Sequence, residues 1–456
     1  MELGARAPAS CAALGGAAAV PWRSAGHPSP STIGGARHAA SRSPAEHVAL
    51  RLFAGLARLI SILASPSAIL ALAVLWCGAC AAAPATPPDG RCPDGVDLVY
   101  TWVNGADPRH QASLRAALHR TDVAASHQAP AVGHAQAQRF RDFGAASTLR
   151  FSLRSQQRFA PWIRHVWIVT ADAETQRPDW LTRDRSAPVT VVPHAAIFPG
   201  WAQRAGALPT FNSCAIEMNL HRIKGLAECY LYLNDDVVFL KPLSLDDFWE
   251  PGAAHPFAFT NYQMAPFSSK NQPTWSVKLF HVGREIRRIT RQHREDVLLV
   301  GHHGHFFQRS VARQVVDVAF NRSCRATTLT RWRSAESFWL PFAYSNYAHA
   351  ELGAPRKRVH ALYFGLTDEE GADAVQRAID RIASEAPRLK FAWACFNDLL
   401  GERASEEVVA ALHAGLLELF PARSKFETDR PEVEMAACLA PSDGRAAASR
   451  EGQVQC

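Results

Sequence analysis

The sequence predicts an α/β fold, with a mixed sheet flanked by helices and preceded by one transmembrane helix. Apolar, strand-like runs alternate with segments of helical spacing between residues 96 and 427, the pattern of helices packed on a largely parallel sheet. A separate run, residues 59–83, has no charged side chain and is long enough to cross a bilayer as a helix. Of the 456 residues, 48% are hydrophobic and 20% charged, which is typical of a folded protein.

The alternation divides the folded part into short elements. Runs rich in β-branched and aromatic residues predict strands at 96–103, 165–170, 189–192, 229–233 and 237–240. The spacing of apolar residues predicts helices at 149–159 and 212–226, a highly charged helix at 285–296 and an amphipathic helix at 406–420. In such sheets ligands bind outside the carboxyl ends of the strands. Polar residues that directly follow a strand are therefore the first candidates for a functional site.

The first 83 residues predict a tail and a membrane anchor. Residues 1–50 are rich in Ala, Gly, Pro and Ser, which predicts a disordered tail, with a transit peptide as the alternative. Residues 51–83 are expected to form a transmembrane signal-anchor. Arg51 and Arg58 before the apolar run, and Asp89 after it, place the N-terminus in the cytoplasm and the rest in a lumen or outside the cell. A cleaved signal peptide is the alternative.

The remaining boundaries follow from composition. We expect a linker at 84–95, a folded domain at 96–428 and an irregular tail at 429–456. Seven cysteines follow the apolar run; in an oxidising lumen some can pair, but an odd number leaves at least one over, and the pattern of pairs stays open. The net charge of +7 is mild for this length, and basic runs dense enough for nucleic-acid binding are missing.

The turn after the predicted strand 229–233 offers two adjacent carboxylates. Asn234, Asp235 and Asp236 stand between two apolar runs. Such carboxylates are costly at the end of a buried strand unless they are paired or bind a cation. Mg²⁺ and Mn²⁺ prefer oxygen ligands and hold phosphates through one or two carboxylates. We therefore predict a divalent-metal site at Asp235 and Asp236, with a solvated turn as the alternative.

Four other segments carry residues suited to phosphate chemistry. They are Asn104 and Gly105 after strand 96–103, the histidines His302, His303 and His305, the arginines Arg331 and Arg333, and the pair Asn397 and Asp398. An Asn-Gly turn exposes N–H groups that can cradle phosphate. The histidines lack zinc-site spacing but suit general-base work, and arginine binds phosphate with two parallel hydrogen bonds. An ordinary turn or a charged surface explains each segment equally well alone.

Together these segments resemble the Stealth family. Four blocks carry the likeness in order: 97–108 (DLVYTWVNGADP), 149–170 with 208–239, 301–311 with 331–338, and 390–398 with 419–427. The family includes bacterial capsule-polysaccharide phosphotransferases and the catalytic subunit of the Golgi N-acetylglucosamine-1-phosphotransferase. The likeness spans residues 97–427, nearly all of the predicted folded domain, and so implies a Stealth-like catalytic domain at 96–428 with a Rossmann-like, nucleotide-sugar-transferase-like sheet.

The resemblance implies an enzyme that forms phosphodiesters. A nucleotide-sugar donor, UDP-linked in the Golgi enzyme, gives sugar-1-phosphate to a hydroxyl of a glycan or polysaccharide acceptor, and UMP leaves. Mg²⁺ or Mn²⁺ is the implied cofactor. Apart from the resemblance, the expected partners are the membrane, through the N-terminal anchor, and a second copy of the chain in a homodimer. With the anchor, the likeness implies a single-pass type II protein in the lumen of the Golgi or another secretory compartment.

The block matches also imply roles for individual residues. His302 would take the proton of the attacking hydroxyl, Arg333 would stabilise developing charge, and Asp236 would act with Asp235 at the metal. The residues implied to line the donor and acceptor sites are Asn104, Asp107, Arg154, Asn212, Glu217, Asn397 and Asp398.

Several alternatives stay open at this point. His303 and Gly304 replace an apolar residue and a proline of the family pattern, so His302 and His303 are both candidates for the base. Arg154 would contact phosphate or hold Asp142. Thr148 stands where the family commonly has Glu. The rival functions are a metal-dependent glycosyltransferase that releases UDP and a non-catalytic glycan-binding protein.

Overall fold

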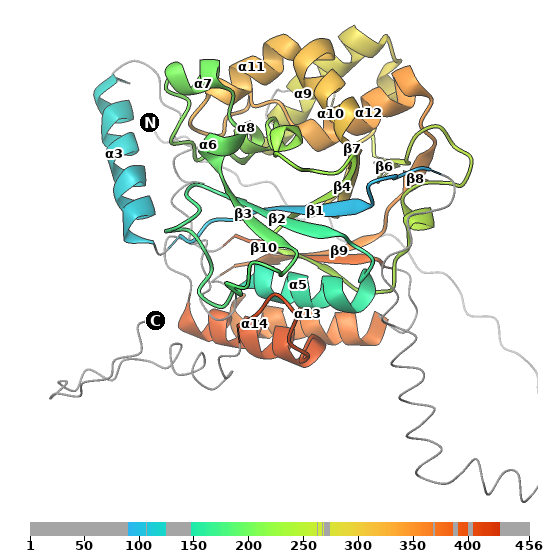
Figure 1. The fold of residues 1–456 in the computed structure, drawn as a ribbon. Helices are drawn as coiled ribbons and strands as arrows, with labels where there is room; N and C mark the ends of the chain where they lie inside the picture. The colour runs from blue at the N-terminus through green and yellow to red at the C-terminus, as the bar shows by residue number, and fades with distance from the viewer. Residues whose placement is uncertain are drawn as a thin grey trace, which may run out of the picture. The chain divides into compact units, whose positions relative to one another are not determined.

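The computed structural model describes residues 90–124 except 106, residues 147–399 except 262, 267, 269–273, 368–369 and 386–390, and residues 405–428 (Figure 1). The expected tail at 1–50, the signal-anchor at 51–83, the first six residues of the linker (84–89) and the tail at 429–456 lie outside these residues. Within the described part, no helix has the length and apolar character needed to cross a membrane.

A five-stranded sheet forms the centre of the fold and confirms the mixed α/β prediction. Its order is β3 (Val189–Pro193), β2 (His165–Thr170), β1 (Val96–Thr101), β4 (Cys229–Asn234) and β7 (His305–Gln308). The first four strands are parallel, and β7 runs antiparallel to β4. The carboxyl ends of β1, β2, β3 and β4 therefore meet the amino end of β7 at one edge, which we call the carboxyl edge.

A second sheet of three strands meets the first through one turn. Its order is β5 (Val237–Phe239), β10 (Trp393–Asp398) and β9 (Ala361–Leu366). The Asp235-Asp236 turn joins β4 to β5, and the amide of Phe396 donates to the carbonyl of Asp236 at 2.8 Å. Both sheets thus present their ends to this turn. A two-stranded pair, β6 (Ala258–Thr260) and β8 (Arg356–Arg358), completes the strands.

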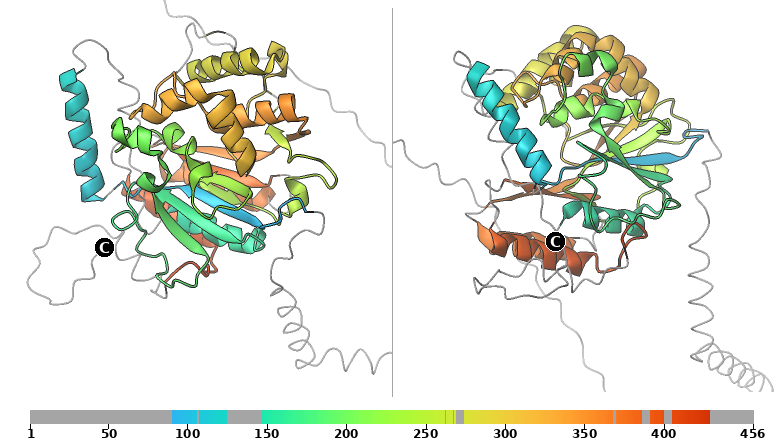
Figure 2. Two further views of the ribbon diagram at one scale, coloured as in Figure 1. Left: turned by 45° about the horizontal axis from the view of Figure 1, so that its top comes forward. Right: turned by 60° about the vertical axis from the view of Figure 1, so that its left-hand side comes forward.

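Helices cover the sheets on both sides, as Figures 1 and 2 show. Above the five-stranded sheet in Figure 1 lie α8 (Ser213–Glu217), α9 (Thr274–Thr290), α10 (Arg309–Gln314), α11 (Asn321–Leu329) and α12 (Leu340–Leu352). Below the three-stranded sheet lie α5 (Thr148–Phe159), α13 (Gly371–Glu385) and α14 (Glu406–Leu419). The other described α-helices are α3 (Pro108–Ala124), α6 (His194–Ile197) and α7 (Gly200–Arg204), and a π-helix spans Val315–Ala319.

The period of two along each strand divides the core into layers. In β1, Val99 packs on the α9–α12 side, whereas Leu98 and Tyr100 face the space between the two sheets. In β10, Trp393 and Cys395 face that same space, and the alternate residues Ala394 and Phe396 pack against α13 and α14. The three-stranded sheet is therefore buried on both faces along β5 and most of β10, whereas β9 is only partly buried.

Two predicted helices differ from the structure. The segment 212–226 forms only α8 and a single 3₁₀ turn, Leu220–Arg222, because the side chain of Asn219 bonds back to the carbonyl of Ala215 and interrupts the helix. The charged segment 285–296 is the end of the longer α9 followed by a 3₁₀ turn. The first half of α9 is less charged and contains the buried Leu279 and Val282, so the charge pattern predicted only the second half of the helix.

One covalent bond ties the start of the fold to the sheet. Cys92 and Cys229 form a disulfide, and both residues are buried. Among the described cysteines, Cys214, Cys324 and Cys395 are free thiols. The disulfide links the segment before β1 to the first residue of β4, 137 positions later, so it restricts the unfolded chain over a long loop.

Candidate active site

The topology gathers polar residues of distant segments at the carboxyl edge. Asn104 follows β1, Asp235 and Asp236 follow β4, and His302 lies three residues before β7. Because β7 pairs with β4 through Tyr232 and His305, the histidine segment lies beside the end of β4. The carboxyl end of β10 reaches the same turn through the bond from Phe396 to Asp236, which also brings Asn397 to this edge.

The turn after β4 offers oxygen ligands. Asn234 is exposed, and Asp235 and Asp236 are half-buried. Burial raises the pKa of the Cys395 thiol, and the negative charge of the nearby Asp236 carboxylate raises it further. No group of three or more His, Cys, Asp or Glu side chains with the arrangement of a metal site occurs among the described residues. Mg²⁺ commonly needs only one or two carboxylates besides substrate and water, so this oxygen donor set fits such an ion.

Glu217 is a buried carboxyl at the end of α8. Its residue is 4% exposed, and its Oε2 makes no hydrogen bond within the described part. Oε1 lies 3.3 Å from the hydroxyl of Tyr232, which is 2.8 Å from Oδ1 of Asn234. Burial raises the pKa of Glu217 to about 7, against the opposing effect of the charges of Lys278 and Arg333. The carboxyl is therefore balanced between its two protonation states near neutral pH.

Lys278 is a candidate site residue that the sequence analysis missed. It lies on α9, with its Nζ 3.9 Å from Sγ of Cys214 and 5.3 Å from the centre of the Trp339 ring. Its charge lowers the pKa of both Glu217 and His302. No motif surrounds this lysine. The one feature of the sequence that could have indicated it is its position one helical turn before the buried Val282 of α9.

Arg333 is held by Ser213, and the loop that carries it is held by Asn212. Its Nη2 donates to the hydroxyl of Ser213, the first residue of α8. Asn212 caps the same helix, since its Oδ1 accepts from the amide of Cys214 at 3.1 Å. The amide group of Asn212 donates to Oγ1 of Thr330 at 2.9 Å and to the carbonyl of Trp332 at 3.2 Å. Asn212, predicted to bind substrate, thus fastens α8 to the loop that carries Arg333.

The three histidines have different environments. His303 and His305 are buried, and burial lowers the pKa of His303 to about 4 and that of His305 well below its usual value. His302 keeps an exposed side, and its ring lies 4.8 Å from the ring of Tyr363. Protein around its other sides desolvates it and, with the charge of Lys278, lowers its pKa. His302 is therefore neutral at pH 7 and is the accessible member of the group.

Asn104 and Asp107 are joined by Gln176. Oε1 of Gln176 accepts from the amide of Asn104 at 2.8 Å, and its Nε2 donates to Oδ2 of Asp107 at 2.7 Å. The other oxygen of Asp107 accepts from the amide of Arg109 at 2.9 Å, the bond of a helix N-cap. Both oxygens of Asp107 are thus used in holding the loop after β1 and starting α3.

Arg154 lies apart from the carboxyl edge. Its Nε and Nη2 contact the two oxygens of Glu427 at 2.8 and 2.7 Å, and Arg150 contacts Oε2 at 2.7 Å. All three side chains are almost fully buried. This cluster ties α5 to the segment after α14. Of Asp398, the structure describes only the backbone at the end of β10, and Asp142 lies outside the described residues.

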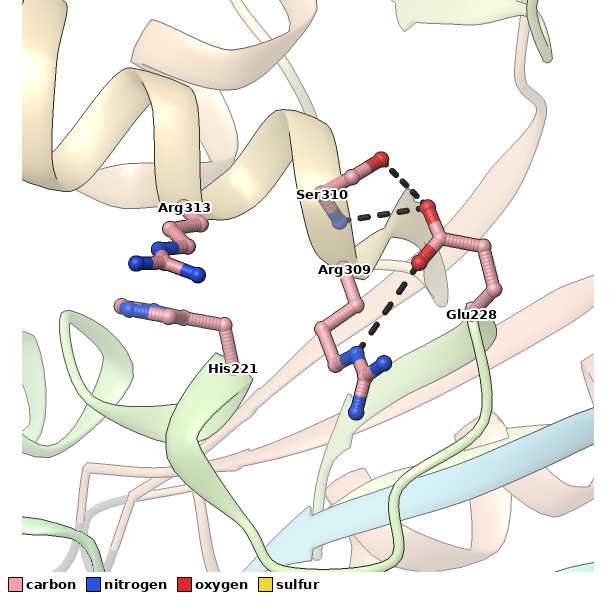
Figure 3. Close-up of a pocket in the computed structure, with 5 residues that line it drawn as sticks. All are labelled: His221, Glu228, Arg309, Ser310 and Arg313. Carbon is pink, nitrogen blue, oxygen red and sulfur yellow. Dashed lines mark hydrogen bonds and ion pairs between the residues drawn. The ribbon is translucent and has the colours of Figure 1, made fainter.

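A cavity of about 370 Å³ lies at the opposite edge of the sheet (Figure 3). It is lined by His221, Glu228, Arg309, Ser310 and Arg313. Glu228 directly precedes β4 and Arg309 directly follows β7, so the cavity adjoins the amino end of β4. Glu228 accepts from the backbone and hydroxyl of Ser310 and pairs with Arg309. This cavity is therefore separate from the carboxyl edge and contains none of the predicted site residues.

Comparison with known proteins identifies the two most characteristic segments. Residues 94–122 match Stealth protein CR1, conserved region 1, and residues 139–256 match Stealth protein CR2, conserved region 2. The chain carries Stealth conserved regions 1 and 2. The predicted resemblance is thereby confirmed. The two Stealth regions contain β1, β2, β4, α8 and the Asp235-Asp236 turn.

Curated relatives of this chain carry transferase names. It is 31% identical over 356 residues to "Exopolysaccharide phosphotransferase SCO6023" of Streptomyces coelicolor, covering 76% of this chain and 54% of the relative. It is 34% identical over 164 residues to "Capsular polysaccharide phosphotransferase cps1A" of Actinobacillus pleuropneumoniae (34% and 38%). It is 44% identical over 128 residues to "N-acetylglucosamine-1-phosphotransferase subunits alpha/beta" of Mus musculus (28% and 10%). The chain thus spans about half the length of the first of these relatives.

Proposed function

We propose that the chain transfers a sugar-1-phosphate group from a UDP-sugar to a hydroxyl of a glycan or polysaccharide. The donated group would be N-acetylglucosamine-1-phosphate or another hexose-1-phosphate. One observation carries the proposal: the carboxyl edge combines the carboxylates of Asp235 and Asp236, the cations of Lys278 and Arg333, and the accessible, neutral His302. Phosphoryl transfer depends on such groups for positioning and charge stabilisation. The phosphotransferase names of the relatives support the reaction class.

The two cations are suited to the diphosphate of the donor. Arg333 offers a planar set of donors and is oriented by Ser213, and arginine binds phosphate oxygens through paired hydrogen bonds. Lys278 approaches from α9. The ionised form of Glu217 interacts favourably with both charges, so it would keep them in place before the donor arrives. Fixed charges of this kind stabilise the transition state without having to reorganise.

His302 would act as the general base. The oxygen of the acceptor hydroxyl forms a bond to the phosphorus that carries the sugar, and the bond between that phosphorus and the oxygen bridging to the nucleotide breaks. The proton of the hydroxyl moves to a ring nitrogen of His302, and UMP leaves with the bridging oxygen. A neutral imidazole can accept this proton, and the lowered pKa of His302 keeps the ring neutral at pH 7.

Asp235 and Asp236 would hold Mg²⁺ or Mn²⁺, with Asn234 and Asn397 as neighbouring oxygen donors. A bound divalent ion would neutralise charge on the donor diphosphate.

We also propose that the domain folds in an oxidising compartment, such as the lumen of the Golgi or another secretory compartment, because the buried Cys92–Cys229 disulfide is of a kind that persists there. The signal-anchor and the homodimer stay predictions.

The released nucleotide tests the proposal. The full chain would be incubated with UDP-N-acetylglucosamine, Mn²⁺ and a mannose-rich glycan, and the nucleotides separated. UMP that depends on the acceptor supports the proposal. Release of UDP would instead identify a glycosyltransferase. Glycan binding without any nucleotide release, across a panel of sugar nucleotides and both metals, would identify a non-catalytic glycan-binding protein.

A further inference from the structure

We propose that Tyr363 and Leu399 form a platform for one sugar ring of the acceptor, next to His302. The pyranose ring would stack on the Tyr363 ring and present its hydroxyl toward the imidazole. The inference rests on the proposed function, since it assigns one subsite of the same active site. It adds a residue from β9, a strand that contains no residue of the predicted site.

The position of Tyr363 in the sheet places it toward the active site. In β9, Leu362 packs into the core formed with α13 and α14, so the next residue, Tyr363, lies on the opposite face. Tyr363 is in register with Cys395 of β10, which is in register with Val237 of β5. This row of side chains leads from the Asp235-Asp236 turn, beside Val237, to Tyr363 at the edge of the sheet.

The contact with His302 fixes the platform relative to the candidate base. The two ring centres are 4.8 Å apart, with the planes tilted by 52°. The imidazole and the tyrosine ring are therefore in direct contact. A sugar stacked on that ring would have its outer hydroxyls within the range in which a general base acts.

The platform is exposed and apolar. Tyr363 is 47% exposed and Leu399 is 41% exposed, although large apolar side chains in the described part are mostly buried. Gly365 lets them come together, because a Cβ at that position would lie 2.7 Å from Leu399 and 3.8 Å from Tyr363. An exposed apolar patch beside polar groups is typical of a ligand-binding surface.

The chemistry of the patch favours a sugar over the other substrate group. A pyranose ring has faces of C–H groups and a rim of hydroxyls, so it matches an aromatic face with polar neighbours. The donor diphosphate, by contrast, needs the charges of Lys278, Arg333 and the carboxylate turn. The charged donor side and the apolar acceptor side thus lie at opposite ends of the row that leads from the Asp235-Asp236 turn to Tyr363.

Steady-state kinetics of the full chain test this subsite. Tyr363→Ala should raise the KM for the glycan acceptor about tenfold, which corresponds to ~1.4 kcal/mol, and leave the KM for UDP-sugar within about twofold. Tyr363→Phe should retain the acceptor KM of the unmodified chain, because the ring is kept. Leu329→Ala, a similarly exposed apolar residue on α11, is the matched control and should change neither value.

A binding measurement separates this inference from the proposed function. Saturation-transfer NMR with the free glycan should show contact between protein and sugar in the unmodified chain and Tyr363→Phe, and weaker contact in Tyr363→Ala. An unchanged acceptor KM in Tyr363→Ala, or an equal rise in both KM values, would overturn the subsite while the function stands. Absence of acceptor-dependent UMP release from the unmodified chain would overturn the function, and the subsite with it.

Discussion

The hydroxyl of Tyr232 lies 3.3 Å from Oε1 of Glu217 and links that buried carboxyl to the Asn234–Asp236 turn. The same hydroxyl is 2.8 Å from Oδ1 of Asn234 and 3.2 Å from Oγ1 of Thr101. Strand β4 thus leads into the Asn234–Asp236 turn and also carries the tyrosine whose hydroxyl contacts Glu217. The charge state of Glu217 and the arrangement of the turn are coupled through one side chain.

Removing that hydroxyl should move the pH dependence of activity. The hydrogen bond from Tyr232 lowers the pKa of Glu217, so Tyr232→Phe should raise this pKa. Since the ionised carboxylate is proposed to hold the cations, activity rises as pH increases through the pKa, and the rise should shift upward by about 0.7 pH unit for a bond of ~1 kcal/mol. Profiles of kcat/KM against pH would measure the shift.

Tyr230→Phe is the control for this shift. Tyr230 lies two residues earlier on the same face of β4, and its buried hydroxyl makes no hydrogen bond within the described part. Its removal should leave the pH profile unchanged. Equal profiles for both variants would contradict the role assigned to Tyr232.

Replacing His302 should remove the base without unfolding the protein. His302→Gln should lower kcat by about 10²- to 10⁴-fold, the usual effect of losing a general base, and keep the melting temperature, because the ring is exposed. His303→Asn should instead lower the melting temperature, since His303 is buried against His305 and Phe259. A fall in kcat confined to the His303 variant would make His303 the base.

The metal assignment can be tested without turnover. Asp236→Asn should weaken Mn²⁺ binding at least about tenfold in calorimetric titration, because one of two anionic oxygen ligands is lost. Asp184→Asn, on the exposed loop between β2 and β3, is the control and should bind Mn²⁺ as the unmodified chain does. Similar affinity in all three proteins would place the ion elsewhere.

The buried cluster at Glu427 predicts a stability change with a defined pH window. Arg154 and Arg150 outweigh burial and lower the pKa of Glu427 from 4.5 to about 2. The folded state therefore gains stability from this carboxylate above pH 4.5, and this gain is lost as pH falls from 4.5 toward 2. At neutral pH, Glu427→Gln should lower the free energy of unfolding by about 3 kcal/mol, since two arginines lose their buried partner.

Chemical denaturation at several pH values would check this prediction. The difference between the unmodified chain and Glu427→Gln should be largest near pH 7 and shrink as pH falls toward 2. Glu385→Gln, which removes an exposed i,i+4 pair with Arg381, should cost at most about 0.5 kcal/mol. Equal costs for both variants would show that the cluster contributes no more than a surface pair.

The sequence predicted the sheet and the polar residues at its carboxyl edge because both depend on local patterns. Buried strands such as β2 and β4 appear as short apolar runs, and residues after parallel strands meet at one edge, as Asn104 and Asp236 do. Residue type alone did not show how a polar side chain is used. Arg154, predicted to bind substrate, forms a buried ion pair with Glu427, 273 residues later in the chain.

The residues that sequence analysis missed depend on long-range packing. Lys278 reaches Cys214 from α9, 64 positions away, and Tyr363 reaches His302 from β9. Neither belongs to a motif, and each obtains its place only when separate elements pack together. The sequence could not distinguish His302 from His303 as the candidate base, because their different exposure depends on packing. Next to them, Gly304 has no side chain and leaves room for Trp393 and Leu231.

The fate of the phosphorus next to the sugar tests the central claim most directly. A UDP-sugar labelled with ³²P in that phosphate would be incubated with the full chain, Mn²⁺ and a glycan acceptor, and the glycan separated from the nucleotides. The account predicts label in the glycan, in a linkage that resists phosphatase until mild acid removes the sugar, together with unlabelled UMP. Label that stays in UDP while the sugar moves to the glycan would contradict it.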